Sequence, residues 1–467
     1  MALTKLVCTI GPASKNPKVI RSLAKSGMSA ARINTAFGGP KEWTEFVHAI
    51  REATSALIIF DLKGPDTRII TNRERSIAAH ERIEAGFSEK GGLGTYFNRD
   101  IAGQMKTGDT LVVNAGLVKF KVVGKSKKSA VLEALESGFL KNGGSVHSLS
   151  REFDLPPVSE QDRRAIAVAK KEGERVFALS MARSEKDIAL LRGLAPESVI
   201  IAKVESRSGV ANIDGIIESS DIVMVARGDL GIEMPLEKVP FVQKSIIEKC
   251  RRAGKASIVA TQMLESMVYS TVPTRAEVSD IANAIIDGTD ALMLSGETAN
   301  GKYPELAART IMRIAEEAEK SYTPSAPISM GAQAGNYSEI ICGCARDIAN
   351  STGVTKILTP TRSGFTPRMI SRFRVKKPIY ALTEDRAVAK RLDFHFGVTP
   401  IVVGREPRKL EDCIFEAKKR GIISKDDILA VTLGQFSDKP ATNTVYYVDL
   451  KHSEFARGFK TGGNGGA

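Results

Sequence analysis

The stretch DIVMVARGDLGIEMPLEKVPFVQKSIIEKCRRAGKASIVAT (221–261) contains one β-then-α unit and the strand that follows it. Its apolar runs, at 221–226 and 256–261, are short and uninterrupted, which is typical of strands buried on both faces of a parallel sheet. Between them, residues 239–254 have the pattern of an amphipathic helix that ends at Gly254, just past a basic last turn. This unit predicts a parallel α/β architecture.

Six further runs of the same kind lie on either side of this stretch. They are KLVCTI (5–10), AARIN (30–34), ALIIFD (56–61), RVFALS (175–180), SVIIAKV (198–204) and DALML (290–294). Together with the first two runs they give eight β-then-α units over about 250 residues, which is the pattern of a (β/α)8 TIM barrel.

Two segments interrupt or end this pattern. Residues 67–154 are rich in glycine and alternate in polarity, as in TLVVNAGLVKFKVVG (110–124), and they predict an inserted small all-β lid domain. Residues 322–338 are rich in Pro, Ser, Gly and Ala, and predict a boundary. Beyond it, β/α alternation restarts and predicts a C-terminal open α/β domain. Its four strand-like runs are at 355–361, 378–383, 399–404 and 427–433.

These patterns predict five parts of the chain. They are the first part of the barrel (1–66), the lid (67–154), the second part of the barrel (155–324), the C-terminal effector and oligomerisation domain (325–455) and a flexible tail (456–467).

The composition of the 467 residues is that of a soluble globular protein, with 42% apolar and 26% charged residues. The net charge of +13 is spread along the chain, which favours anionic small substrates over nucleic acid. The first residues carry no signal-peptide pattern, and no apolar run is long enough for a membrane. The five cysteines are scattered, and Cys342 and Cys344 are too close for a zinc pair. We therefore expect free thiols in a reducing cytoplasm.

Charged and hydroxyl side chains follow the barrel strands. They are Arg32, Asn34, Asp61, Lys63, Lys203, Glu205, Arg227, Asp229, Thr261, Gln262, Ser295 and Glu297. Each one alone is most simply a solvated loop residue or an ion-pair partner. The carboxyl ends of barrel strands meet at one mouth. Because charged or hydroxyl side chains follow six of these strands, they predict an active site at that mouth.

Lys203 and Glu205 flank Val204 in IAKVES, so both side chains point the same way from an extended chain. Glu205 and Asp229 are suited to share one Mg²⁺ ion, completed by substrate oxygens and water. The lysine would then place positive charge among phosphate oxygens. The alternative interpretation is a Lys–Glu pair that closes a barrel strand.

VARGDLGIEMP (225–235) runs from a strand into a turn and a short helix. Its glycines allow backbone N–H groups to approach a ligand, and a helix N-terminus favours phosphate or carboxylate.

Several longer motifs carry a family resemblance. They are TKLVCTIGPAS (4–14), DLKGPDTR (61–68), IAKVES (201–206), VMVARGDLGIEMPLEKVPFVQK (223–244), ATQMLESM (260–267), PTRAEVSDIANAI (273–285) and DGTDALMLSGETANGKYP (287–304). In this order the chain resembles the pyruvate kinases. The resemblance implies transfer of the phosphoryl group of phosphoenolpyruvate to ADP, giving pyruvate and ATP, in the last step of glycolysis.

Two other classes of function stay open at this point. One is a different magnesium-dependent barrel enzyme acting on phosphoenolpyruvate or pyruvate, such as a lyase or a phosphomutase. The other is a basic nucleic-acid binder, or a regulatory relative without catalysis.

The resemblance also implies roles for individual residues. Lys203 stabilises the transferring phosphoryl group, Arg32 grips the phosphate of phosphoenolpyruvate, and Thr261 lies beside the methylene carbon that is protonated. The backbone of Gly228 and Asp229 holds the substrate carboxylate, and the side chains of Glu205 and Asp229 bind Mg²⁺ or Mn²⁺. Asn34 and Arg68 lie near the nucleotide phosphates. Ser295 and Glu297 lie near the path of the proton that reaches the enolate.

The chain departs from the family pattern at the monovalent-cation site. Ala36 and Phe37 replace a serine and a histidine, and Leu62 and Asp66 replace a threonine and a glutamate. Asn34, Asp61 and the Leu62 carbonyl remain as ligands of a weak potassium site, so we expect that K⁺ is not required.

The lid departs as well. It reads VNAG (113–116) and GGSVHSL (143–149), with no lysine where the family has one facing the nucleotide, and Lys141 is the nearest substitute.

TPTRSGFTPR (359–368) follows a strand and opens a helix in the C-terminal domain. Hydroxyl groups, N–H groups and a cation surround the helix N-terminus, supplied by Thr361, Arg362, Ser363, Gly364 and Thr366. This pattern predicts a site for a phosphorylated effector, and the alternative is a helix cap with a tight turn. The resemblance further implies a cytoplasmic, allosteric homotetramer.

Overall fold

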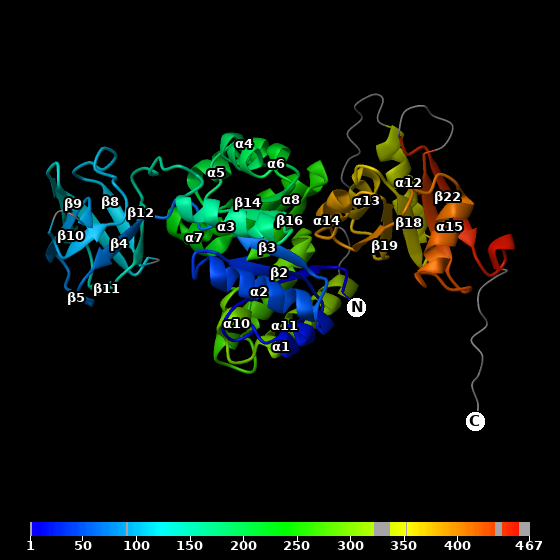
Figure 1. Cartoon of the computed structure of the whole chain (residues 1–467), viewed down its shortest axis with the longest axis horizontal. Coiled ribbons are helices and arrows are strands. Elements are labelled where there is room, and N and C mark those ends of the chain that lie inside the picture. The colour runs from blue at the N-terminus through cyan, green and yellow to red at the C-terminus, as the bar shows by residue number, and fades with distance from the viewer. Residues whose placement is uncertain are drawn as a thin grey trace.

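The computed structural model describes residues 2–89, 92–114, 116–321, 337–351, 353–434 and 441–456. Most of the predicted boundary at 322–338, and the predicted tail apart from Ala456, lie outside these residues. Figure 1 shows three bodies in a row, with a small β barrel at one end, the large barrel in the middle and the C-terminal sheet at the other end. The residue limits of the five predicted parts remain a proposal.

The large barrel closes through eight parallel strands in the order β1-β17-β16-β15-β14-β13-β3-β2. Their bounds are β1 Lys5–Ile10, β2 Met28–Asn34, β3 Leu57–Asp61, β13 Val176–Leu179, β14 Val199–Val204, β15 Ile222–Ala226, β16 Ala256–Ala260 and β17 Ala291–Leu294. The predicted (β/α)8 barrel is confirmed.

Helices surround this barrel. They are α1 Pro17–Lys25, α2 Pro40–Ala53, α3 Glu160–Lys171, α4 Glu185–Leu194, α5 Arg207–Ala211, α6 Ile213–Ser219, α7 Arg227–Glu233, α8 Val239–Ala253, α9 Arg275–Asp287, α10 Gly296–Ala299 and α11 Pro304–Ser321. On β1, Leu6 and Cys8 pack outward against the helices, whereas Val7 packs into the centre of the barrel. Because both faces are buried, the strands read as continuous apolar runs.

The inserted lid domain is a second closed barrel, of order β10-β6-β7-β4-β12-β8-β9, beside a two-stranded sheet of β5 and β11. The strands are β4 Arg68–Thr71, β5 Arg75–Ile77, β6 Arg82–Gly86, β7 Thr95–Phe97, β8 Thr110–Val113, β9 Val118–Lys125, β10 Ser129–Ala134, β11 Gly138–Leu140 and β12 Gly144–Ser148. Alternate residues, such as Val118, Phe120 and Val122 of β9, fill its core. The lid leaves the large barrel after β3 and returns before α3, so it stands over the carboxyl ends of the barrel strands.

The C-terminal domain is an open five-stranded sheet of order β20-β19-β18-β21-β22. Its elements are α12 Tyr337–Ser351, β18 Lys356–Pro360, α13 Phe365–Ser371, β19 Ile379–Thr383, α14 Arg386–Leu392, β20 Val398–Val402, α15 Leu410–Lys419, β21 Ile428–Leu433 and β22 Thr444–Asp449. The first four strands match the predicted runs. The antiparallel edge strand β22 was not predicted, because its side chains are mostly half-buried and form no apolar run.

No helix among the described residues is long and apolar enough to cross a membrane.

Candidate active site

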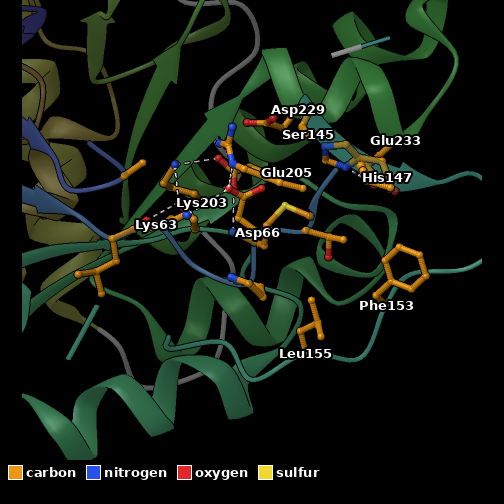
Figure 2. Close-up of a pocket in the computed structure, with 18 of the residues that line it drawn as sticks. Lys63, Asp66, Ser145, His147, Phe153, Leu155, Lys203, Glu205, Asp229 and Glu233 are labelled. Carbon is orange, nitrogen blue, oxygen red and sulfur yellow. Dashed lines mark hydrogen bonds and ion pairs between the residues drawn. The ribbon is translucent and has the colours of Figure 1, made fainter. Parts of the chain in front are cut away.

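A cavity of about 240 Å³ opens where the mouth of the large barrel meets the lid. The barrel strands and the loops that follow them supply Arg32, Asn34, Asp61, Lys63, Lys203 and Glu205, the helix α7 supplies Asp229 and Glu233, and the lid supplies Arg68, Ser145 and His147. Figure 2 shows Lys63, Lys203, Glu205 and Asp66 close together, with His147 and Glu233 beyond them. Seven of the twelve predicted strand-end residues therefore line one cavity, whereas Arg227, Thr261, Gln262, Ser295 and Glu297 are not part of its lining.

Lys203 lies at the centre of a buried charge network. Its Nζ atom is 3.1 Å from Asp61 Oδ1 and 2.9 Å from Glu205 Oε1. On the other side, Arg32 Nε donates to Asp61 Oδ2 at 2.6 Å. Four charged groups from three strands thus share one site, and the two cations and two carboxylates balance each other.

A serine that sequence reasoning missed completes this network. Ser180, which directly follows β13, accepts a hydrogen bond from Lys203 Nζ at 2.7 Å and donates one to the Leu62 carbonyl at 2.7 Å. It lies at the end of the run RVFALS (175–180), so the strand-end rule could have found it.

The neighbouring charges set the pKa values of this network. Burial lowers the pKa of Lys203, but Asp61 and Glu205 outweigh burial and hold that pKa above its ordinary value. Burial raises the pKa of Asp61, but Lys203 and Arg32 bring it below its ordinary value. Lys203 therefore stays an ammonium and Asp61 stays a carboxylate at neutral pH.

Glu205 has the opposite shift. Burial and the nearby charge of Asp229 raise the pKa of Glu205 above its ordinary value, although Lys203 opposes them. Its Oε2 atom accepts the backbone N–H of Met181 at 2.7 Å. The like charge of Asp229 repels the Glu205 carboxylate, and a cation shared by the two carboxylates would remove this repulsion.

Thr261 and Gly228 lie side by side but are not among the described residues that line the cavity. The Gly228 N–H donates to Thr261 Oγ1 at 2.9 Å, and that hydroxyl donates to the Ala260 carbonyl at 2.6 Å. Thr261 has φ of 69°, and Gln262 has φ of 54°. A β-branched residue in the left-handed region is strained, and such strain concentrates at functional sites.

Ser295 and Glu297 lie apart from the cavity lining. Glu297 is fully buried, and its carboxylate accepts the backbone N–H groups of Leu264 at 2.9 Å and Ser295 at 2.7 Å. These contacts tie the loop after β16 to the loop after β17.

The oxygens predicted for a weak potassium site are engaged by protein donors. Asn34 Oδ1 accepts the Ala36 N–H at 3.2 Å, and the Leu62 carbonyl and Asp61 are bound as described above.

Arg68, the first residue of β4, lies at the entrance to the lid. Its guanidinium donates to Asp66 Oδ2 at 2.5 Å and to the Gly143 carbonyl at 2.6 Å. Lys141 is exposed and does not line the cavity, whereas Ser145 and His147 do. Sequence reasoning missed His147 and Glu233. The alternation of GGSVHSL (143–149) could have shown that Ser145 and His147 share one face of a strand.

The loop before α13 forms a tight turn. Gly364 has φ of 79°, and its N–H donates to Thr361 Oγ1 at 2.9 Å. Arg362 pairs with Glu406 at 2.7 Å, Ser363 is exposed, and Thr361 and Thr366 are buried. The five predicted residues thus lie together around the start of the helix.

Comparisons with known proteins agree with this geometry. Residues 1–308 match the family model "Pyruvate kinase, barrel domain", and residues 339–446 match "Pyruvate kinase, alpha/beta domain". A pyruvate kinase of Bacillus licheniformis is 38% identical over 95% of this chain and 80% of its own length. A pyruvate kinase of Clostridium acetobutylicum is 34% identical over 96% of this chain and 100% of its own length.

Proposed function

Because the chain belongs to the pyruvate kinase family, we propose that the cavity around Lys203 is the place of its phosphoryl transfer. The activity is that of the family: a phosphotransferase that moves the phosphoryl group of phosphoenolpyruvate to ADP and forms pyruvate and ATP. The observation that carries the assignment of the site is the buried ammonium of Lys203, held at the mouth of the barrel by Asp61 and Glu205.

Lys203 and Arg32 stabilise the transferring group in this proposal. A loose phosphoryl transition state spreads negative charge over its oxygens, so fixed cations in a site shielded from water are the main catalytic device. The Asp61 carboxylate holds both cations in place, since it contacts each of them. In this proposal Arg32 binds the phosphate of phosphoenolpyruvate, and Lys203 stays in contact with the phosphoryl group during transfer.

The family uses a divalent metal, and we propose Mg²⁺ or Mn²⁺ held by Glu205 and Asp229. Both carboxylates line the cavity, and their mutual repulsion fits a shared cation. Among the described residues no group of three or more His, Cys, Asp and Glu side chains could hold a metal ion. Two protein carboxylates completed by water and substrate oxygens is a usual arrangement for Mg²⁺. Such an ion would neutralise charge on the phosphoryl oxygens.

Two further groups act on the pyruvate half of the reaction. The backbone of Gly228 and Asp229 holds the substrate carboxylate, and the Thr261 hydroxyl supports protonation of the methylene carbon of the enolate. The contact between Gly228 N–H and Thr261 Oγ1 supports this pairing, because it places the hydroxyl beside the backbone that would bind the carboxylate.

Asn34 and Arg68 are the proposed contacts to the nucleotide phosphates. We propose that no K⁺ ion is needed beside them. Asn34 Oδ1, Asp61 and the Leu62 carbonyl already accept hydrogen bonds from protein donors, and Lys203 supplies positive charge at Asp61.

We also propose a cytoplasmic homotetramer that responds to a phosphorylated metabolite at Thr361–Thr366. Exposed large apolar side chains on two domains support the assembly, since such side chains are often covered by a partner subunit. They are Leu236, Phe241, Tyr269 and Val272 on the large barrel, and Tyr337, Ile340 and Tyr447 on the C-terminal domain.

A coupled assay of ATP and pyruvate formation tests the function. Both products are expected in equal amounts, only with ADP present, and a chelator should abolish turnover until Mg²⁺ is restored. Pyruvate formation that is independent of ADP would instead indicate a lyase or a phosphomutase. Binding to DNA or RNA without turnover would indicate a nucleic-acid binder.

A further inference from the structure

His147 of the lid contacts Glu233 of the large barrel across the cavity rim. The Nδ1 atom of His147 lies 3.0 Å from Glu233 Oε1, and the two side chains are 13% and 4% exposed. Both residues line the cavity (Figure 2). This imidazole is nearly buried and joins two domains at the proposed phosphoryl-transfer site. None of the roles proposed above involves it.

The strand geometry aims this imidazole at the cavity. In the small barrel β12 pairs with β4 so that Ser145 lies opposite Arg68. Directly opposed residues share one face of a sheet, and so do residues two apart on one strand. Arg68, Ser145 and His147 therefore form one face of the β4–β12 ribbon, and all three line the cavity.

The large barrel fixes the position of the ring from two helices. Glu233, on α7, also lies 3.5 Å from Arg207 of α5 through its Oε2 atom. Arg207 donates to the carbonyls of Ser148 at 3.0 Å and Leu149 at 2.7 Å, which directly follow His147 in the chain. With Nδ1 facing Glu233, the described residues offer no hydrogen-bond partner to Nε2.

The charges around the ring keep it a donor. Burial lowers the pKa of His147, but Glu233 and Asp229 of α7 and Asp66 of the loop after β3 outweigh burial and raise it. Arg68 on β4 and Arg207 on α5 are the nearby cations, and each is paired with a carboxylate, Asp66 and Glu233 respectively. The raised pKa favours the imidazolium, in which Nδ1–H donates to the Glu233 carboxylate and Nε2–H is the donor that faces the cavity.

We propose that His147 Nε2 donates a hydrogen bond to a phosphate oxygen of the bound nucleoside diphosphate, and that His147 and Arg68 are together the lid's contacts to ADP. Lys203 and Arg32 lie at the mouth of the large barrel with Asp61, and are the proposed contacts to phosphoenolpyruvate. His147 lies on the lid, on the same face of the β4–β12 ribbon as Arg68. Glu233 is a positioning residue that holds the ring through Nδ1. This inference rests on the proposed assignment of the cavity to phosphoryl transfer.

Two isosteric variants separate contact with the nucleotide from a merely structural link. The amide nitrogen of His147→Asn falls near the position of Nδ1, so it keeps a partner for Glu233 but loses the group that faces the cavity. The amide nitrogen of His147→Gln falls near Nε2, so it keeps a neutral donor toward the cavity. His80→Gln is the matched control, because His80 also lies in the lid, 3.8 Å from Glu133, but is 80% exposed.

We expect His147→Asn to raise KM for ADP by about tenfold or more, as for the loss of a hydrogen bond to a charged group. KM for phosphoenolpyruvate and kcat should change by less than about threefold, as expected when uniform binding is lost. His147→Gln should lie between His147→Asn and the parent, and His80→Gln should match the parent.

Three results would overturn the proposal. They are an unchanged KM for ADP in His147→Asn, an equal rise of KM for both substrates, or a stronger effect of His147→Gln than of His147→Asn, which would make the Glu233 contact the only role. Lys203→Met is assayed in parallel. Full activity of that variant would remove the proposed site itself, whereas its inactivity with a normal His147→Asn would remove only the role of His147.

Discussion

Lys203 Nζ lies 3.1 Å from Asp61 Oδ1, although the two residues lie at the carboxyl-end portions of strands β14 and β3, which are separated by β13. Ser180, which directly follows that intervening strand, accepts from Lys203 and donates to the carbonyl of Leu62, the residue after Asp61. The carboxylate therefore keeps an ammonium buried and charged before any substrate arrives. A group that is charged and fixed in advance needs no reorganisation when negative charge develops on the phosphoryl oxygens.

Lys203→Met should abolish most phosphoryl transfer. The lost cation acts on charge that develops in the transition state, so kcat should fall by about 10²-fold or more, and KM should change less. The fold should persist, because Asp61 keeps its contact with Arg32 at 2.6 Å. Steady-state kinetics and circular dichroism check both points, with Lys249→Met, at an exposed ion pair with Asp214, as the control. A kcat near that of the parent would remove Lys203 from this role.

Thr261→Ala should slow pyruvate formation more than it weakens substrate binding. The hydroxyl is proposed to act on the enolate, after phosphoenolpyruvate is bound, so kcat should fall and KM should stay within about threefold. Thr261→Ser keeps the hydroxyl that accepts from Gly228 and should retain most activity. If KM alone rises in Thr261→Ala, the residue is a binding group instead.

The large barrel could be predicted from the sequence because strands buried on both faces leave continuous apolar runs. The eight predicted runs coincide with the eight strands, whereas the half-buried β22 gave no such signal. The rule that strand carboxyl ends meet at one mouth also placed Lys203, Glu205 and Asp61 together.

Pairings between distant segments could not be predicted in this way. The contact of His147 with Glu233 joins residues 86 positions apart, in two different barrels. It depends on how the lid stands on the large barrel, which no local pattern encodes. The strand-end rule could have placed Ser180 at the mouth of the barrel, but its contacts with Lys203 and the Leu62 carbonyl depend on the order of the strands around the barrel.

The loop before α13 should couple to activity. A phosphorylated metabolite bound there would bias one arrangement of domains, and linkage then requires that phosphoenolpyruvate tighten the effector in return. Arg362→Ala combined with Ser363→Ala should abolish the response to any sugar phosphate or phosphoglycerate that activates the parent. Arg362 now pairs with Glu406, so Glu406→Gln should strengthen the response by freeing the guanidinium. An unchanged response in the double variant would place the effector elsewhere.

His395 should make the protein less stable in mild acid. Burial lowers the pKa of His395 from 6.5 to about 4, at the junction where Arg374 and the adjacent Phe396 bind Asp290 of the barrel. Below about pH 6.5, His395 binds a proton in the unfolded chain but stays neutral in the folded protein. The free energy of unfolding therefore falls as the pH drops from about 6.5 toward 4. The loss is on the order of 3 kcal/mol at the acid end.

Chemical denaturation at several pH values measures this effect. His395→Gln should be less sensitive to pH than the parent across this window, and His452→Gln, at an exposed position, should behave like the parent. Equal pH dependence of the parent and His395→Gln would show that other groups control acid stability.

The enzyme should work without potassium. A monovalent ion needs several oxygen ligands, and Ala36 supplies no side-chain oxygen. The three remaining ligands are already bound, since Asn34 accepts from Ala36, the Leu62 carbonyl accepts from Ser180, and Asp61 contacts two cations. Part of the acceptor capacity of each of these oxygens is therefore already used by a protein donor. Positive charge lines the cavity and can balance the substrate charge together with the divalent metal; it comes from Arg32, Lys63, Arg68 and Lys203.

Activity is compared in potassium-free buffer and after addition of K⁺ at matched ionic strength, and the two rates should agree within about twofold. A rise of tenfold or more on adding K⁺, equal to about 1.4 kcal/mol of transition-state stabilisation, would show that a potassium site exists despite these contacts.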